Sequence, residues 1–198
     1  DSTHLTAPSQ WIAGERAAER AKETDFRRID QEAIVRERER AFAPLNRNEG
    51  AHPKKLKEEI QNIMMEYVGP LRNEEGLNKG LSALKKIQEQ EKSVYTKGKS
   101  RIMNFEWMEA LEIGNMLDVA MMTTEGALFR KESRESHYRE DFSEHFPAGD
   151  NQNWGVETVM KRSDDQIRIS KVPMAYDEIK PGEFEVQKVD VPYQTFKA

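Results

Sequence analysis

Apolar residues recur at helical spacing in three stretches in the middle of the chain. The first predicts a helix that Pro53 opens and Gly69-Pro70 ends, because the residue before a proline avoids helical geometry. Its apolar positions are separated by four, three, one and three residues, which places them on one helical face: Leu56, Ile60, Ile63, Met64 and Tyr67. A second series predicts a helix that runs to about Tyr95: Leu77, Leu81, Leu84 and Ile87.

The third predicted helix is the longest and the most apolar. Asn104 suits its N-cap, and the helix dipole favours Glu106 in its first turn. Its stripe is Trp107, Leu111, Gly114, Leu117, Met121, Thr124 and Leu128, widened by Ile113, Met116, Ala120 and Ala127. So broad a stripe indicates a central helix with more than one neighbour. The three helices together predict a small antiparallel bundle.

The chain on either side of these helices has a different character. Residues 10–22 predict a short helix rich in small residues, and residues 24–42 a charged helix that Pro44 and the following polar residues break. Beyond Asp141, alternating apolar residues around Ser163-Asp164-Asp165 predict a β-hairpin. The later apolar positions, interrupted by prolines, predict an extended segment in an irregular tail: Phe184, Val186, Val189 and Val191.

The predicted fold is therefore mainly α, a three-helix antiparallel bundle with additions at both ends. We expect an N-terminal helical extension over 1–48, the helical bundle over 49–142, and a hairpin with an extended tail over 143–198.

Composition narrows the classes of function. Of 198 residues, 36% are hydrophobic and 34% charged, so we expect a modest core and elongated helices, long loops or a partner surface. The net charge of -5 and the alternating charges of residues 36–40 disfavour a role in nucleic-acid binding.

No cysteine is present, which excludes disulfides, thiolate zinc sites and cysteine-bound iron–sulfur clusters within the chain. No apolar run approaches the ~20 residues that span a bilayer, and no signal peptide is visible, so we expect no direct membrane insertion and a cytoplasmic location.

Two segments resemble one protein family. Residues 63–77 read MMEYVGPLRNEEGL after Ile63, similar to the pattern M-x-x-x-V-G-(x)-x-R-x-x-x-G-L in the C-terminal domain of fumarate reductase and succinate dehydrogenase flavoprotein subunits. Residues 130–142, RKESRESHYREDF, resemble the family's R-x-E-S-R-G-A-H-x-R-x-D-(F/Y)-P, and residues 150–154 match its D-x-x-N-W. The resemblance covers about 52–170. It departs at Glu135-Ser136, where Gly-Ala is usual, and at Ser143, where proline is common.

This resemblance implies a domain of a larger enzyme. The parent would carry FAD in a flavin-binding domain that precedes this one, and this chain has no G-x-G-x-x-G, so we expect no cofactor and no catalytic residue here. It implies two partners, the flavin-binding domain and an iron–sulfur subunit, with the parent able to associate with the cytoplasmic side of a membrane. Residues 11–19 resemble the last helix of such a flavin domain, and an interface left uncovered could pair with a second copy.

Cationic groups cluster after the longest helix, where they complement the negative end of its dipole: Arg130, Lys131, Arg134, His137 and Arg139. Arg134 and Arg139 can also fork to carboxylates such as Glu132 or Asp141. Two readings stay open. The cluster is a capping and ion-pair group that docks the tail, or it approaches the flavin domain or substrate cleft, with Arg134, His137, Tyr138 and Arg139 as the interface or flavin-proximal candidates.

The histidines, the methionines and the choice of protein class each allow more than one interpretation. His137 and His145 lie near carboxylates, but no metal-binding spacing occurs and we expect no metal. The nine methionines predict core filling, with a methionine-lined partner groove as the alternative. Adenylylsulfate reductase and aspartate oxidase flavoproteins have a similar domain, and an independent helical adaptor is the competing class. Exposed Trp11, Ala17 and Ala21 would favour the domain of a larger protein, and a defined groove would favour the adaptor.

Overall fold

The computed structural model describes residues 6–26, 28–163 and 166–174. The chain divides into two compact units, residues 1–41 and residues 42–198. The predicted extended segment over 184–191 lies outside the described residues, as does the Asp164-Asp165 turn.

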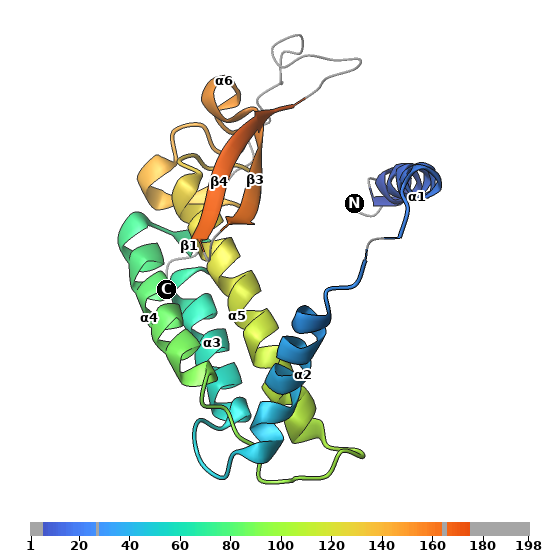
Figure 1. Cartoon of the computed structure of the whole chain (residues 1–198). Helices are drawn as coiled ribbons and strands as arrows, with labels where there is room; N and C mark the ends of the chain where they lie inside the picture. Colours follow the sequence, from blue (N-terminus) through green and yellow to red (C-terminus); the bar gives the residue numbers. More distant parts are fainter. Residues whose placement is uncertain (1–5, 27, 164–165, 175–198) are drawn as a thin grey trace. The chain divides into compact units, whose positions relative to one another are not determined.

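The second unit is built on the predicted bundle. Helices α3 (Pro53–Tyr67), α4 (Glu74–Glu91) and α5 (Phe105–Phe129) lie side by side, as Figure 1 shows. One core joins buried residues of all three: Leu56, Ile60, Leu84, Ile87, Ala110, Ile113, Leu117, Ala120 and Met121. Each fully buried aliphatic side chain stabilises the fold by about 1.5–3 kcal/mol. The mainly α class is confirmed, and the sequence pattern correctly placed these apolar faces.

Polar caps set the helix ends. The Asn73 side chain accepts a hydrogen bond from the Gly76 N–H at 2.9 Å, and Asn104 accepts from the Trp107 N–H at 3.0 Å, which confirms the predicted N-cap of α5. Helix α4 ends at Glu91, earlier than the predicted Tyr95. The reason is that the Tyr95 N–H bonds to the Ala51 carbonyl at 3.1 Å, which draws the chain away from the helix axis.

The N-terminal helices differ from the prediction in their bounds. Helix α1 covers Thr6–Glu23, and α2 covers Gln31–Asn46 rather than 24–42. The expectation that Pro44 breaks this helix is wrong, because Pro44 lies inside it. A proline near a helix end removes only its own N–H, and the Pro44 carbonyl still accepts the Thr96 N–H at 3.1 Å.

The predicted hairpin is present. Strand β3 (Val156–Ser163) pairs antiparallel with β4 (Gln166–Pro173), with Met160 opposite Ile169. Between α5 and the hairpin lie the short 3-10 turn η2 (Glu140–Phe142) and helix α6 (Asn151–Trp154). A second pairing was not predicted: β1 (Leu71–Arg72) lies parallel to β2 (Tyr138–Arg139).

Candidate functional site

The two segments that resemble the flavoprotein family meet in space. The turn between α3 and α4 supplies β1, the segment after α5 supplies β2, and their pairing sets Leu71 opposite Tyr138 and Arg72 opposite Arg139. Around it lies a group of charged side chains that we call the signature junction: Arg72, Arg130, Glu132, Arg134, His137, Arg139 and Asp141. The junction therefore joins the start of α4 to the end of α5.

Arg139 is the centre of this junction. Its side chain is 0% exposed, and its guanidinium donates two hydrogen bonds to Asp141, from Nε at 2.8 Å and from Nη2 at 2.7 Å. Nη1 donates to the Ala127 carbonyl at 2.6 Å, one of the carbonyls that the end of α5 leaves without a helical partner. The predicted fork between Arg139 and Asp141 and the predicted capping of the long helix are both confirmed.

Asp141 extends the contact to the next helix. Its Oδ2 accepts the Glu74 N–H at 3.0 Å, so one carboxylate holds the first turn of α4 while its arginine partner holds the last turn of α5. The hydrogen bonds from Arg139 lower the pKa of Asp141, and the Glu74 N–H adds to the effect. The pair is a double cap, and it requires the two helix ends to lie side by side.

A second carboxylate, Glu132, gathers the chain that follows α5. Its side chain is 1% exposed and accepts from Arg130 Nε at 2.7 Å, from Arg134 Nε at 3.1 Å and from the Asp150 N–H at 2.6 Å. Burial alone would raise the pKa of Glu132, but these donors outweigh it and the pKa is lowered. The predicted pairing of Arg134 with Glu132 is confirmed.

Arg130 links this group to α6 and the hairpin. Its Nη2 donates to the Trp154 carbonyl at 2.7 Å, and its guanidinium lies 5.7 Å from the Trp154 ring centre. The Lys171 ammonium from β4 lies 3.3 Å from the centre of the same ring. The cations after α5 thus hold the following segments in place.

His137 has one tautomer that satisfies both ring nitrogens. Arg72 Nη1, always a donor, lies 2.8 Å from Nδ1, which must accept; Nε2 then carries the proton and donates to the Arg130 carbonyl at 3.2 Å. Burial is the largest cause that lowers the pKa of His137, and the charges of Arg72, Arg139 and Arg130 act in the same direction. The imidazole is therefore neutral in the folded state near pH 7.

The four predicted candidates differ in accessibility. Arg139 is wholly enclosed by this chain, whereas Arg134, His137 and Tyr138 are half-buried. The Tyr138 ring contacts Phe146 edge to face at 5.1 Å between centroids. Sequence reasoning missed two members of the site. Arg72 stood in the first motif but was given no role, and the Ser133 hydroxyl, buried between the Arg139 N–H and carbonyl, showed no periodic signal.

The departure of the sequence at Glu135-Ser136 has a structural counterpart. Arg134 and His137 exchange backbone hydrogen bonds of 2.8 Å, which closes a two-residue turn. Glu135 occupies its first central position with φ of +48°, a left-handed conformation that costs a non-glycine residue about 1–2 kcal/mol. The turn thus adopts a conformation that suits glycine although the chain carries glutamate.

The methionines were only partly predicted. Met121 is buried in the core, and Met64 and Met116 pack against it. Met65, Met103 and Met108 are exposed, so the interpretation that all nine fill the core is wrong. A groove with methionines among its lining residues exists between α4, α5 and the hairpin.

In its own unit, α1 exposes Trp11, Ala17 and Ala21, the feature expected of a domain of a larger protein. The groove is the feature expected of an adaptor, so the features expected of both classes are present.

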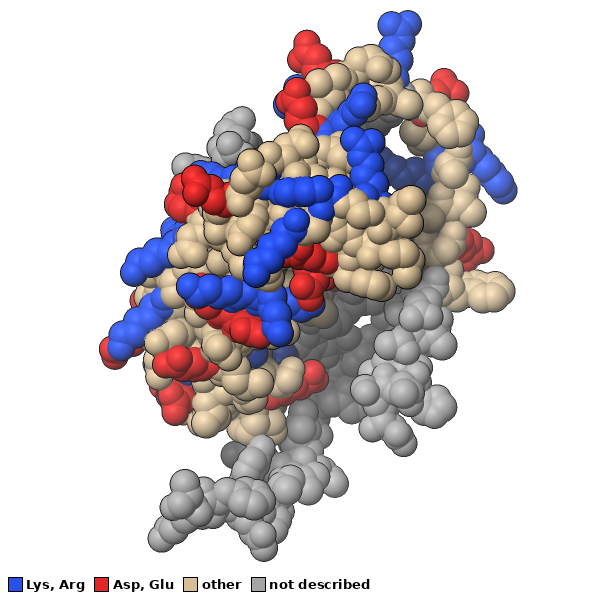
Figure 2. All heavy atoms as spheres, turned by 90° about the horizontal axis from the view of Figure 1, so that it is seen from below, with Lys and Arg blue, Asp and Glu red and all other residues tan. Residues whose placement is uncertain are grey.

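The surface charge, the possible metal ligands and the helix lengths were compared with the sequence-based expectations. Lys and Arg are interspersed with Asp and Glu on the face shown in Figure 2. In the described part of the chain, no group of three or more His, Cys, Asp or Glu side chains is placed to hold a metal ion. No described helix is long and apolar enough to cross a membrane.

Comparison with known proteins decides the family. Residues 57–189 match the family of fumarate reductase flavoprotein C-terminal domains. The chain belongs to this family. An uncharacterized FAD-dependent oxidoreductase of Methanocaldococcus jannaschii is 37% identical over 134 residues, 67% of this chain and 23% of that protein. The succinate dehydrogenase flavoprotein subunit of Rickettsia conorii is 34% identical over 104 residues, 52% of this chain and 17% of that protein.

Solved structures share the fold. The FrdA protein of Escherichia coli quinol fumarate reductase matches 87% of this chain with a TM-score of 0.72 and 28% identity, over 30% of its own chain. Adenylylsulfate reductase of Archaeoglobus fulgidus matches 79% of this chain and 26% of its own, with a TM-score of 0.68 and 22% identity, which shows a common fold alone. The chain spans about a fifth of the length of the curated relatives that it matches.

Proposed function

We propose that this chain is the C-terminal helical domain of an FAD-dependent oxidoreductase of the succinate dehydrogenase/fumarate reductase type. Its role is structural: it packs on the flavin-binding domain, helps to close the site there, and borders an iron–sulfur subunit. The family membership over residues 57–189 supports this role, as does the small share of its relatives that the chain spans. FAD, the substrate and the electron path belong to the rest of the parent, which we expect in the cytoplasm or on the cytoplasmic side of a membrane.

The observation that carries the structural role is that the charged residues of the signature junction bind other parts of this same chain. Arg139, Asp141 and Glu132 direct their hydrogen bonds to helix ends and to neighbouring segments of this chain. A catalytic acid or base needs an accessible atom near the reacting group, and the enclosed Arg139 offers none. We assign Arg134, His137 and Tyr138 to the surface that faces the flavin-binding domain, positioned by the enclosed residues behind them.

A comparison of the isolated chain with the full parent polypeptide tests the proposal. Titration of each with FAD, followed by flavin fluorescence, and an assay of fumarate reduction and succinate oxidation give two independent readouts. We expect flavin binding and turnover from the parent and neither from the 198-residue chain. Binding of FAD or turnover by the chain alone would overturn the structural role.

Two other assignments compete. An adenylylsulfate reductase or aspartate oxidase type of parent has a related domain, but the string from His137 to Asp141 resembles the dicarboxylate enzymes more closely. An independent adaptor is favoured by one observation, the groove of about 610 Å³ between α4, α5 and the hairpin. A parent without a flavin-binding domain would make the adaptor the leading assignment.

A further inference from the structure

The loop between α4 and α5 presents an apolar tip to the solvent. It follows Glu91, the last residue of α4, and leads into Phe105, the first residue of α5, at one end of the bundle (Figure 1). Ile102 is 80% exposed, Met103 79% and Phe105 66%. These three residues are close in sequence, so they form one apolar surface that the core leaves uncovered. We call the segment that carries them, residues 92–105, the α4–α5 tip.

The α4–α5 tip is also strongly basic. It contains no carboxylate and four cations, all of them exposed: Lys92, Lys97, Lys99 and Arg101. The whole chain has a net charge of -5, so positive charge is concentrated in this segment. Lys92 forms a salt bridge with Glu89 at 2.8 Å, but no carboxylate in the described part of the chain forms one with the other three cations.

The contacts that these cations do make leave their charge uncompensated. The Lys99 ammonium donates to the Arg47 carbonyl, and the Arg101 guanidinium lies 4.7 Å from the centre of the Phe42 ring. Carbonyl and ring are both neutral groups. The tip therefore keeps a local excess of positive charge beside its apolar side chains.

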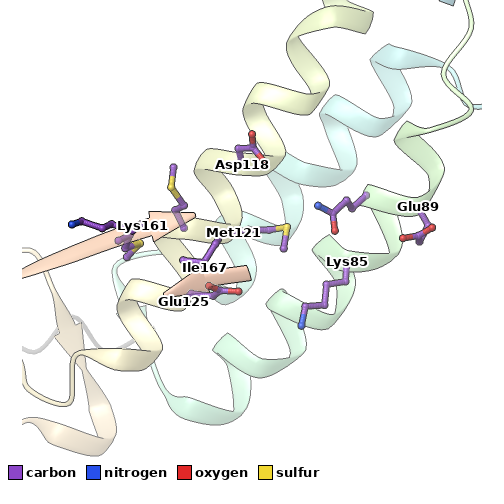
Figure 3. A pocket seen from close by; sticks show the side chains of 10 residues that line it. Lys85, Glu89, Asp118, Met121, Glu125, Lys161 and Ile167 are labelled. Carbon is purple, nitrogen blue, oxygen red and sulfur yellow. The ribbon is translucent and has the colours of Figure 1, made fainter. Parts of the chain in front are cut away.

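The groove between α4, α5 and the hairpin has the opposite arrangement. Two lysines line it, Lys85 and Lys161, and Figure 3 shows them together with the three carboxylates of the same groove: Glu89, Asp118 and Glu125. Burial raises the pKa of Glu125, and the charge of Lys85 opposes this shift. The cations of the groove are thus balanced within the chain, whereas those of the tip are not.

Hydrogen bonds to its backbone hold the tip in one conformation. Glu106 Oε2 accepts the Lys97 N–H at 2.9 Å and the Gly98 N–H at 3.1 Å, and Asn104 Nδ2 donates to the Gly98 carbonyl at 2.9 Å. Met103 adopts a φ of +52°, a left-handed conformation that persists only where the surroundings fix it. The apolar side chains are therefore presented by a pre-organised loop and do not fold back onto the core.

We propose that the α4–α5 tip binds directly to the surface of a membrane that contains anionic phospholipids. Apolar side chains next to Lys and Arg are typical of segments that lie in the interface of a bilayer. An anionic leaflet attracts each cation close to its surface. Neighbouring apolar side chains on a loop need a matching pocket in a protein partner, but a bilayer accepts them without one.

In this arrangement the apolar residues enter the head-group region and the cations bind lipid phosphates, while no part of the tip spans the bilayer. The inference goes beyond the proposed function because it gives this chain a lipid contact of its own. It also makes the contact dependent on a few named side chains, which can be replaced one group at a time.

Co-sedimentation of the 198-residue chain with vesicles tests the proposal. Vesicles of phosphatidylcholine and phosphatidylserine in equal amounts are compared with vesicles of phosphatidylcholine alone. We expect binding to the anionic vesicles only. Binding should weaken by at least about tenfold when salt is raised from about 0.1 M to about 1 M, because the Debye length falls from about 10 Å to about 3 Å.

Two double variants separate a local effect of charge from the net charge of the chain. Lys97→Gln with Lys99→Gln should weaken binding by about tenfold or more, since each cation near an anionic surface contributes about fivefold. Lys79→Gln with Lys161→Gln removes the same charge from α4 and β3, and should change binding by less than about twofold. Circular dichroism verifies that both double variants are folded.

A fluorescent label reports whether the apolar residues enter the membrane. Because the chain has no cysteine, Ile102→Cys and Met65→Cys each provide a single thiol for an environment-sensitive dye. Met65 is the matched control, since it is 76% exposed but lies on α3. We expect the emission of the dye at position 102 to shift to the blue with anionic vesicles, and the emission at position 65 to stay unchanged.

Four results would overturn the proposal. They are no binding to the anionic vesicles, an equal loss of binding in the two double variants, an equal emission shift at positions 102 and 65, and binding to poly-glutamate but not to vesicles. The last result would assign the tip to an acidic protein segment. None of them bears on flavin binding or turnover by the parent, so failure of this proposal and failure of the proposed function are distinguishable.

Discussion

Replacement of Arg139 by methionine should be among the most damaging single changes in this chain. Methionine keeps much of the length and apolar volume of the side chain but removes all of its hydrogen-bond donors. Asp141 then loses both of its bonds to the guanidinium, at 2.8 and 2.7 Å, and the Ala127 carbonyl loses its bond at 2.6 Å. The substitution breaks the double cap between α4 and α5 without creating a large cavity.

The expected cost follows from burial. Breaking a buried ion pair by removal of one partner costs about 3–5 kcal/mol. The Asp141 side chain is 28% exposed and can recover some hydration, so we expect a smaller cost, about 2–4 kcal/mol in the free energy of unfolding. Urea unfolding followed by circular dichroism at 222 nm measures this difference as a shift of the midpoint at constant slope.

Two further variants make the test specific. Asp141→Asn keeps an acceptor for Arg139, and a double-mutant cycle with Arg139→Met should give a coupling energy of about 1–3 kcal/mol. Lys79→Met removes a cation from the exposed ion pair with Glu75 and should leave the midpoint unchanged. A loss below about 1 kcal/mol for Arg139→Met, or zero coupling, would refute the double cap as a stabilising contact.

Three other changes follow from the geometry around the junction. The lowered pKa of His137 means that the unfolded state binds a proton more readily, so stability should be constant above the unfolded pKa of about 6.5 and fall as pH drops below it; His137→Gln, which can still accept and donate, should flatten urea midpoints measured between pH 7 and 5. Glu135→Gly should raise stability by roughly 0.5–1 kcal/mol, because glycine tolerates the φ of +48° but gains freedom when unfolded; an unchanged or lower midpoint would mean that the turn is not strained. Gly149→Ala should lower the thermal midpoint, since its Cβ would lie 2.5 Å from the Arg134 guanidinium at a φ of +79°, whereas Gly14→Ala, with nothing within 4 Å, should not.

Periodicity was sufficient for the bundle because its helices bury continuous apolar faces. The stripe of α5 and the cap at Asn104 could be read from spacing and residue type alone. Helix ends that are set by contacts between residues distant in the sequence could not be predicted in this way. Helix α4 ends early because the Tyr95 N–H bonds to the Ala51 carbonyl, a contact that no local pattern reveals. Helix α2 continues past Pro44, which the local sequence did not indicate either.

The candidate site shows the same division. The cations after α5 and their carboxylate partners are close in sequence, so the forks from Arg134 to Glu132 and from Arg139 to Asp141 could be anticipated. The contact of Arg72 with His137 joins residues 65 positions apart and depends on the pairing of β1 with β2, which are too short for a periodic signal. The sequence likewise predicted a broad apolar helix but not which of its faces the bundle leaves uncovered.

The coding sequence upstream of Asp1 tests the central claim most directly. If this chain is the C-terminal domain of a flavoprotein, the open reading frame should continue upstream through a G-x-G-x-x-G that follows a strand and opens a helix. A start codon at or just before Asp1 would contradict the claim, because the FAD-binding part would then not belong to this polypeptide.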